Sequence, residues 1–241
     1  MKTTSTMFSP SGASTRGFVK ICGVCTIDDA VLCADLGADA IGMLLTKPGV
    51  SRKLGSDRLA LDEAASLAAA LPVGLKSVLL VDAVQLDDLL RLAEEIKPNA
   101  MQIRQPLSPA MLCRLKERFP DQGIIKTISV VSGAPVSSLE DEIRAYVDHG
   151  AIDAVLLDSP QGGSGVAHDW VTSASLVERF AGTPVILAGG LSADNVAEAR
   201  RLVRPYGVDV MSGVTSSERR DRKDPVRLRA FLEACHESPE Q

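Results

Sequence analysis

The chain has 241 residues, of which 45% are hydrophobic and 24% charged, and its formal net charge is −5. This composition excludes a collagen-like or wholly disordered chain, and the dispersed basic residues argue against a nucleic-acid-binding face. No apolar run approaches the roughly 18–20 residues that a membrane span needs, so no membrane partner is expected. The odd number of cysteines, five, and the lack of an apolar export signal favour a cytoplasmic location.

The first 17 residues, "MKTTSTMFSPSGASTRG", are small and polar. We expect them to form a disordered extension. Residues 18–236 are expected to form one domain, with 237–241 as a C-terminal tail.

Eight short apolar runs, typical of strands buried on both faces, alternate with longer segments of helical periodicity. The predicted strands are 18–22, 39–45, 75–81, 100–103, 124–130, 153–158, 184–190 and 207–213. Helices are predicted between Thr26 and Gly37 and at 57–71, 86–96, 108–119, 137–149, 171–180, 192–203 and 224–235. Thr26, Ser192 and Asp224 are the expected helix caps, and Pro225 suits a first helical turn. Eight uninterrupted βα units favour the α/β class and a single TIM (β/α)8 barrel over an open, doubly wound sheet.

Active sites of such barrels lie at the carboxyl ends of the strands. Polar or reactive residues expected there are Cys22, Arg52, Asp82, Gln102, Arg104 and Asp158. Three glycine-containing loops, "QGGSG", "AGGL" and "MSGV", follow the last three predicted strands. Such loops, each leading toward a helix N-terminus, favour a phosphate site. The predicted phosphate-binding residues are Gly163, Ser164, Gly165, Gly189, Gly190, Ser212 and Gly213.

The stretch "GFVKICGVCT" places Cys22 and Cys25 three residues apart, a spacing shared with metal and redox motifs. A structural zinc would need two more ligands at suitable spacing. The other cysteines form no second close pair, and the three histidines are scattered. A thioredoxin-like motif would open a helix in a different fold. We therefore expect no metal site.

Three segments carry a resemblance to a known family. "VKICGVCTIDDA", "LLDSPQGGSGVAHDW" and "PVILAGGLSADNVAEARRLVRPYGVDVMSGV" resemble the corresponding segments of phosphoribosylanthranilate isomerases, and the resemblance covers residues 18–235. It implies an aldose–ketose isomerase of tryptophan biosynthesis, which performs an Amadori rearrangement of N-(5-phosphoribosyl)anthranilate without a cofactor. The implied partner is a small phosphosugar, and the implied assembly is a monomer or a homodimer.

The resemblance also implies roles for single residues. Cys22 would be the general base that takes the proton from sugar C2, and Asp158 the general acid that protonates the ring oxygen. Arg52 would hold the anthranilate carboxylate, with Gln102 and Arg104 as further substrate-binding residues. The physical picture agrees, because the ends of the first and sixth strands can flank a sugar from opposite sides. A thiol can serve as the base if its pKa falls toward neutral, and Cys25 would be a packing or loop residue.

Departures from the family pattern leave three hypotheses open. Arg104 and Gln105 stand where the family has His and Gly, Lys53 replaces the tyrosine of its "SPRY" motif, and Thr215 replaces a glutamate. His168 replaces a phenylalanine and is interpreted as a structural, hydrogen-bonding residue. The chain can be a working isomerase that has drifted, or a divergent paralogue acting on a different phosphoribosyl-amine, whose more acidic aglycone Arg104 would suit. The third hypothesis, a non-catalytic phosphosugar-binding barrel, needs neither Cys22 nor Asp158.

Overall fold

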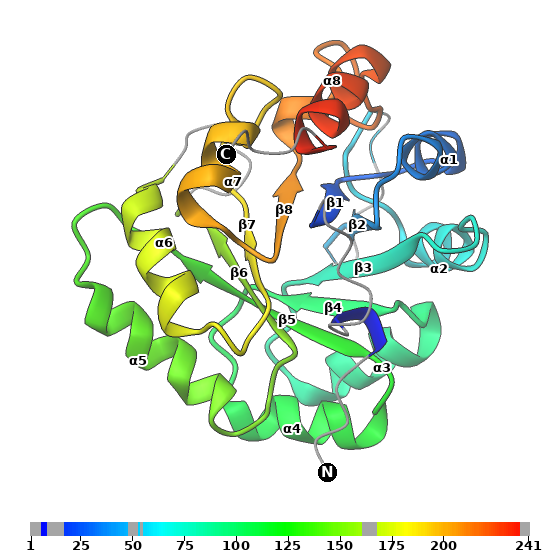
Figure 1. The fold of residues 1–241 in the computed structure, drawn as a ribbon. Coiled ribbons are helices and arrows are strands. Elements are labelled where there is room, and N and C mark those ends of the chain that lie inside the picture. Colours follow the sequence, from blue (N-terminus) through cyan, green and yellow to red (C-terminus); the bar gives the residue numbers. More distant parts are fainter. Residues whose placement is uncertain (1–5, 9–16, 48–52, 54, 161–167, 237–241) are drawn as a thin grey trace.

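The computed structural model of the chain describes residues 6–8, 17–47, 53, 55–160 and 168–236. Eight parallel strands form a closed barrel in which β1 pairs with β8, and eight helices surround it (Figure 1). The strands are β1 (Phe18–Cys22), β2 (Ala40–Leu44), β3 (Lys76–Val81), β4 (Ala100–Ile103), β5 (Gly123–Ser129), β6 (Ala154–Asp158), β7 (Val185–Leu187) and β8 (Gly207–Val210). The helices are α1 (Ile27–Asp35), α2 (Leu61–Ala69), α3 (Leu86–Ile96), α4 (Pro109–Arg118), α5 (Val136–Val147), α6 (Trp170–Arg179), α7 (Val196–Val203) and α8 (Pro225–His236), with 3-10 turns η1 (Thr6–Phe8) and η3 (Ser212–Val214). The predicted TIM barrel is confirmed.

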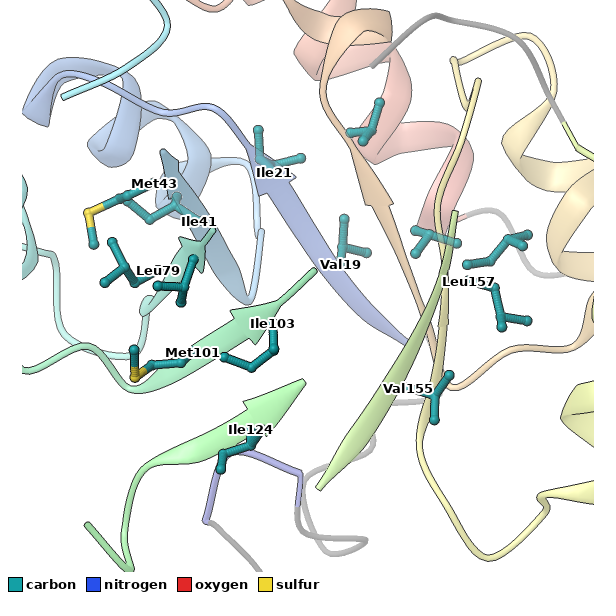
Figure 2. Packing of buried hydrophobic residues seen from close by; sticks show 14 of the residues in the cluster. Val19, Ile21, Ile41, Met43, Leu79, Met101, Ile103, Ile124, Val155 and Leu157 are labelled. Atoms are coloured by element: carbon teal, nitrogen blue, oxygen red, sulfur yellow. The ribbon is translucent and has the colours of Figure 1, made fainter. Parts of the chain in front are cut away.

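The two faces of each strand carry different kinds of residue, as the two-residue period of a strand requires. Outward residues such as Val19 and Ile21 of β1 and Met101 and Ile103 of β4 belong to the large core between barrel and helices (Figure 2). Inward residues form a smaller apolar layer in the amino-terminal and central parts of the strands, which Ala188, just after β7, extends toward the carboxyl ends. Its members are Phe18, Ala40, Val78, Ala100, Ile125, Ala154, Leu156, Ile186 and Ala188. Polar inward residues therefore gather toward the carboxyl ends.

Two of the three expected helix caps are observed. The Oγ1 atom of Thr26 accepts a hydrogen bond from the backbone of Asp29 at 3.2 Å, and Asp224 caps α8 through the backbone N–H of Val226 at 3.0 Å. The third expectation, Ser192 as the cap of α7, is wrong because this helix begins at Val196, one turn later.

Asn195 explains the later start of α7. Its Oδ1 accepts from the backbone N–H of Ser192, and its Nδ2 donates to the carbonyl of Gly190, both at 2.9 Å. These bonds hold residues 192–195 in a turn and brace the glycine loop that follows β7. The predicted start of α2 at residue 57 is also early. Leu59 pairs instead with Leu45 in an isolated parallel bridge, and the helix begins at Leu61.

The amino-terminal base of the barrel is covered by η1, drawn in dark blue in Figure 1. Phe8 is 2% exposed, and its ring lies 5.9 Å from that of Phe18 and 6.2 Å from that of Tyr206. We call Phe8, Phe18 and Tyr206 the base cluster. Alanines of the inward layer leave space here that one aromatic side chain can fill. The expected disorder of the extension therefore does not hold for Thr6–Phe8, whereas residues 1–5, 9–16 and the tail 237–241 lie outside the described part of the chain.

The Phe8→Ala variant tests how much the covering of the barrel base by η1 contributes to the free energy of unfolding. We expect the free energy of unfolding to fall by about 2–4 kcal/mol, because a buried aromatic ring is lost and a terminal segment can only partly close the space. Urea unfolding followed by far-UV circular dichroism would give the difference. Met7→Ala is the matched control because Met7 packs only partly buried against the same layer, and it should cost under about 1 kcal/mol. Unchanged stability of Phe8→Ala would show that η1 does not cover the base in solution.

Among the described helices, none has the length and apolar character that crossing a membrane requires.

Candidate active site

A cavity of about 500 Å³ opens at the carboxyl ends of the strands. It brings together seven of the residues singled out in the sequence: Cys22, Gln102, Arg104, Asp158, Gly189, Gly190 and Ser212. Gly213 lies in η3, next to this wall, without lining it. Arg52, Gly163, Ser164 and Gly165 lie outside the described residues.

Asp158 ends β6 and points into this cavity. Burial raises the pKa of its carboxyl to about 6, and the nearby charge of Asp209 adds to the increase. The backbone N–H of Ser159 donates to Oδ1 at 2.8 Å and opposes the shift. A carboxyl group whose pKa lies this close to neutral is suited to giving a proton to a bound molecule.

Cys22 ends β1 and is 3% exposed. Burial raises the pKa of its thiol, and the charge and hydrogen bond of Lys20 only partly oppose this. The structure therefore shows the opposite shift to the one that a thiol base needs, and the thiol is protonated at neutral pH in the protein alone. Its ionisation must be assisted by whatever occupies the cavity.

A layer of polar side chains lies inside the barrel just below Cys22. The Nζ atom of Lys20 lies 2.8 Å from Oδ1 of Asp209, its neighbour in register on β8. Across the barrel, Nε2 of Gln102 donates to Oγ1 of Thr127 at 3.1 Å. Burial by itself would lower the pKa of Lys20, but Asp209 and Cys22 together raise it. Lys20 is therefore a cation inside the barrel.

Gly42 of β2 makes room for this arrangement. A Cβ atom at this position would lie 2.8 Å from Sγ of Cys22, closer than real Cβ atoms approach, and 3.1 Å from Nζ of Lys20, which is also a tight contact. Sequence reasoning missed Lys20, Gly42 and Asp209. The available signal was the two-residue period, which places Lys20 on the same inward face as Cys22.

Glycines shape the wall formed by the loops after β7 and β8. Gly189 and Gly190 have φ values of +81° and +68°, which residues with a side chain rarely adopt. A Cβ atom on Gly189 would also lie 2.8 Å from the backbone nitrogen of Ser159 and 3.1 Å from Oδ1 of Asp158. One on Gly213 would collide with the carbonyl oxygen of Leu191. The two loops therefore pack backbone against backbone, beside the carboxyl group of Asp158.

Arg104 lies at the rim and is already paired. Its guanidinium makes a two-pronged contact with the carboxylate of Asp82, with Nε–Oδ1 at 2.9 Å and Nη2–Oδ2 at 2.7 Å. Both side chains are partly exposed. The extra positive charge expected from Arg104 is thus balanced within the protein, which weakens the argument for a more acidic aglycone.

Arg58 also lines the cavity, as do Arg220 and Arg227, and sequence reasoning missed it. It is half-buried, and its Nη1 donates to the carbonyl of Leu45 at 2.9 Å. The bridge between Leu45 and Leu59 fixes the backbone next to it. The signal in the sequence was weak, because Arg58 lies inside a segment that was predicted to be helical.

Cys25 and His168 occupy structural positions. Cys25 lies in the outer core between barrel and helices, away from the cavity that Cys22 lines, and both residues are thiols. His168 is buried, and its Nε2 lies 2.7 Å from Oγ of Ser173 in α6. Over the described ranges no cluster of three or more His, Cys, Asp or Glu residues could hold a metal ion.

Comparison with known proteins covers the whole barrel. The family model described as N-(5'phosphoribosyl)anthranilate (PRA) isomerase matches residues 19–234. N-(5'-phosphoribosyl)anthranilate isomerase 1 of Methanosarcina mazei is 40% identical over 227 residues, covering 89% of this chain and 93% of that protein. The structure of N-(5'-phosphoribosyl)anthranilate isomerase from Pyrococcus furiosus matches with a TM-score of 0.74 at 25% identity, covering 91% of this chain and 98% of that one. A phosphoribosyl anthranilate isomerase in complex with reduced 1-(o-carboxyphenylamino)-1-deoxyribulose 5-phosphate matches with a TM-score of 0.71 at 25% identity and the same two coverages, 91% and 98%.

Proposed function

Because the chain belongs to the N-(5'-phosphoribosyl)anthranilate isomerase family, we propose that it isomerises N-(5'-phosphoribosyl)anthranilate to the corresponding carboxyphenylamino-deoxyribulose phosphate in tryptophan biosynthesis. One observation carries this proposal. Cys22 and Asp158 reach the same cavity from two strands that do not pair with each other, beside the backbone-packed glycine loops. A base and an acid can thus act on different atoms of one phosphosugar.

The first step is assigned to Asp158. Its carboxyl group donates a proton to the ring oxygen while the C1–O bond breaks, and the nitrogen lone pair forms the C1=N bond of a Schiff base. The pKa of about 6 keeps a fraction of this carboxyl protonated near neutral pH. Breaking the bond leaves a positively charged iminium in the cavity.

The second step is assigned to Cys22. Beside the iminium the thiol first releases its proton to water. The thiolate then takes the proton from C2, the C–H electron pair forms a C1=C2 bond, and the C1=N pair returns to nitrogen. The resulting enol then becomes the ketone. A nearby positive charge favours the ionised form of a thiol. The iminium therefore lowers the pKa of the Cys22 thiol, which burial raises in the protein alone. Both steps are proton transfers, so we propose that no metal or organic cofactor takes part.

The phosphate is placed against the glycine loops. Gly189 and Gly190, held by Asn195 at the start of α7, and the η3 turn with Ser212 and Gly213 form the described part of this wall. Gly163, Ser164 and Gly165 are proposed to complete it on the strength of the sequence. Backbone N–H groups near helix N-termini favour a phosphate at such a wall.

We place the anthranilate carboxylate against Arg58, because its guanidinium lines the cavity and is held by Leu45. Arg58→Met is expected to raise KM about ten- to a hundredfold, as expected when a charge-assisted contact is lost. Arg58→Lys should recover only part of this, because lysine cannot bind a carboxylate with two parallel hydrogen bonds.

Arg52→Met serves as the comparison, because the sequence motif assigned this role to Arg52. Steady-state kinetics on the three variants decide between the two arginines. A large KM increase in Arg52→Met, with the KM of Arg58→Met close to wild type, would show that Arg52 and not Arg58 binds the carboxylate. Gln102 remains a proposed substrate contact, because its side chain lines the cavity while bonded to Thr127.

The proposed function is tested by turnover of N-(5'-phosphoribosyl)anthranilate with purified protein and by growth of a tryptophan auxotroph that lacks this isomerase. Wild type should restore growth, and the Cys22→Ser variant should not. No turnover by a correctly folded wild-type protein would favour a divergent paralogue or a non-catalytic barrel. We propose that the enzyme acts in the cytoplasm as a monomer or homodimer.

A further inference from the structure

The buried ion pair below the catalytic thiol takes no part in either of the two proposed proton transfers. Lys20 has no exposed surface and Asp209 is 7% exposed, and the two come from neighbouring strands. Sγ of Cys22 and Nζ of Lys20 both lie against Gly42. A buried pair of this kind is weak evidence for stability, because desolvating the two charges offsets their attraction.

We propose that Lys20 is a positioning residue that carries the counter-charge of the Cys22 thiolate, and that Asp209 holds Lys20 in place while the thiol is neutral. This inference rests on the proposed function, in which Cys22 is the base. An ammonium group has three donors, so Lys20 can contact Asp209 and the sulfur at the same time. The negative charge that appears on Cys22 then forms beside a cation that needs no reorganisation.

The other charged groups around Cys22 do not replace Lys20. Nζ of Lys223, from the loop after η3, donates to the backbone carbonyl of Cys22 at 2.6 Å and contacts Oγ1 of Thr215 at 3.3 Å. Burial lowers the pKa of Lys223, so it is the weaker cation of the two. Asp209 is an anion that opposes a thiolate, Asp158 lines the same cavity from β6, and β2 places Gly42 against the sulfur.

The two members of the pair should therefore affect the thiol in opposite directions. Loss of Lys20 removes the counter-charge and leaves Asp209 to oppose ionisation. Loss of the Asp209 charge removes that opposition. The ammonium group of Lys20 then no longer has Asp209 as a charged partner that competes with the sulfur. If the pair served only to hold β1 against β8, both losses would disturb the thiol in the same way.

The test is the rate of alkylation of Cys22 by iodoacetamide as a function of pH, followed by mass spectrometry of the peptide that contains it. This measurement needs no substrate, so its outcome does not depend on whether the proposed reaction occurs. Lys20→Met should slow alkylation at pH 8 by about tenfold or more, which corresponds to a thiol pKa raised by one unit. Asp209→Asn should speed it by roughly three- to tenfold.

Lys126→Met is the matched control. Lys126 is 2% exposed, like Lys20, but it lies on the outward face of β5, with its Nζ donating to the carbonyl of Thr127 at 2.7 Å. Its replacement removes a buried ammonium without touching the cavity and should leave the alkylation rate of Cys22 within about twofold.

Lys20→Met leaves Asp209 buried and unpaired, which can prevent folding. A double variant keeps the proposal testable in that case. Adding Lys20→Met to Asp209→Asn removes the second charge without creating an unpaired one, and it should slow alkylation relative to Asp209→Asn alone. Shifts in the same direction for Lys20→Met and Asp209→Asn, or no slowing in the double variant, would overturn the proposal. The predicted opposite shifts in a protein that fails to turn over N-(5'-phosphoribosyl)anthranilate would support the role of Lys20 and reject the proposed function.

Discussion

Replacing Cys22 by serine is expected to lower kcat by about 10²–10⁴-fold, the usual effect of losing a general base. A serine hydroxyl has nearly the size of the thiol but a far higher pKa, so it cannot take the C2 proton even beside an iminium. KM should change little, because phosphate and carboxylate contacts are intact. Steady-state kinetics and single-turnover measurements on the purified variant provide the check.

Cys25→Ser is the control for this prediction, since the two cysteines are three residues apart and only one lines the cavity. It should keep at least about half of the wild-type kcat, with a stability loss of roughly 1 kcal/mol from placing a hydroxyl in the outer core. Equal loss of activity in the two variants would revive the hypothesis that the pair of cysteines acts together.

The second large effect is expected from Asp158→Asn, which should lower kcat by about 10²–10⁴-fold and at the same time stabilise the fold. The pKa of Asp158 is about 6 in the folded protein, against about 3.9 in an unfolded chain. The folded state therefore binds this proton more tightly, and the stability of the wild type falls as the pH rises from about 4 to about 6. At pH 7 the ionised carboxylate costs about 1–3 kcal/mol, which asparagine does not incur.

Urea unfolding of wild type and Asp158→Asn at several pH values would check this. The advantage of the variant should be full at pH 7 and should shrink toward pH 4; it disappears below that pH, where the wild-type carboxyl is protonated in both states. Asp169→Asn should change the free energy of unfolding in the opposite direction. The hydrogen bond from Thr172 lowers the pKa of Asp169, which also caps α6, so its loss should destabilise the protein near neutral pH. An Asp158→Asn variant less stable than wild type at pH 7 would contradict the raised pKa.

The sequence predicts the barrel well because each unit repeats the same local pattern. The bounds of β1 agree with the prediction, 18–22, since the strand is apolar on its outward face and is followed directly by a glycine. Predictions failed where one specific hydrogen-bonded contact overrides the helical pattern. Within the predicted helix 192–203, the side chain of Asn195 delays the start of α7. Leu59 is kept out of the predicted helix 57–71 by a backbone bridge to Leu45, which is distant in sequence.

For the cavity, the sequence indicates which residues stand at strand ends but not which ones they contact. The pairing of Arg104 with Asp82 and of Lys20 with Asp209 depends on which strands lie side by side in the barrel and on side-chain rotamers. These contacts change the interpretation. Arg104 has no unbalanced charge for a different aglycone, so the hypothesis of a divergent paralogue loses its main support.

The base cluster joins residues from both ends of the chain, and this has a consequence for folding kinetics. Phe8 precedes β1 in the sequence, whereas Tyr206 directly precedes β8. The contact between them closes a loop of nearly the whole chain, which is slow to form. Docking of η1 therefore belongs after the transition state for folding, and its loss in Phe8→Ala should accelerate unfolding while the refolding rate stays close to wild type. Although η1 precedes β1 in the sequence, it is thus among the last elements to dock, and it covers the base of a barrel that has already closed.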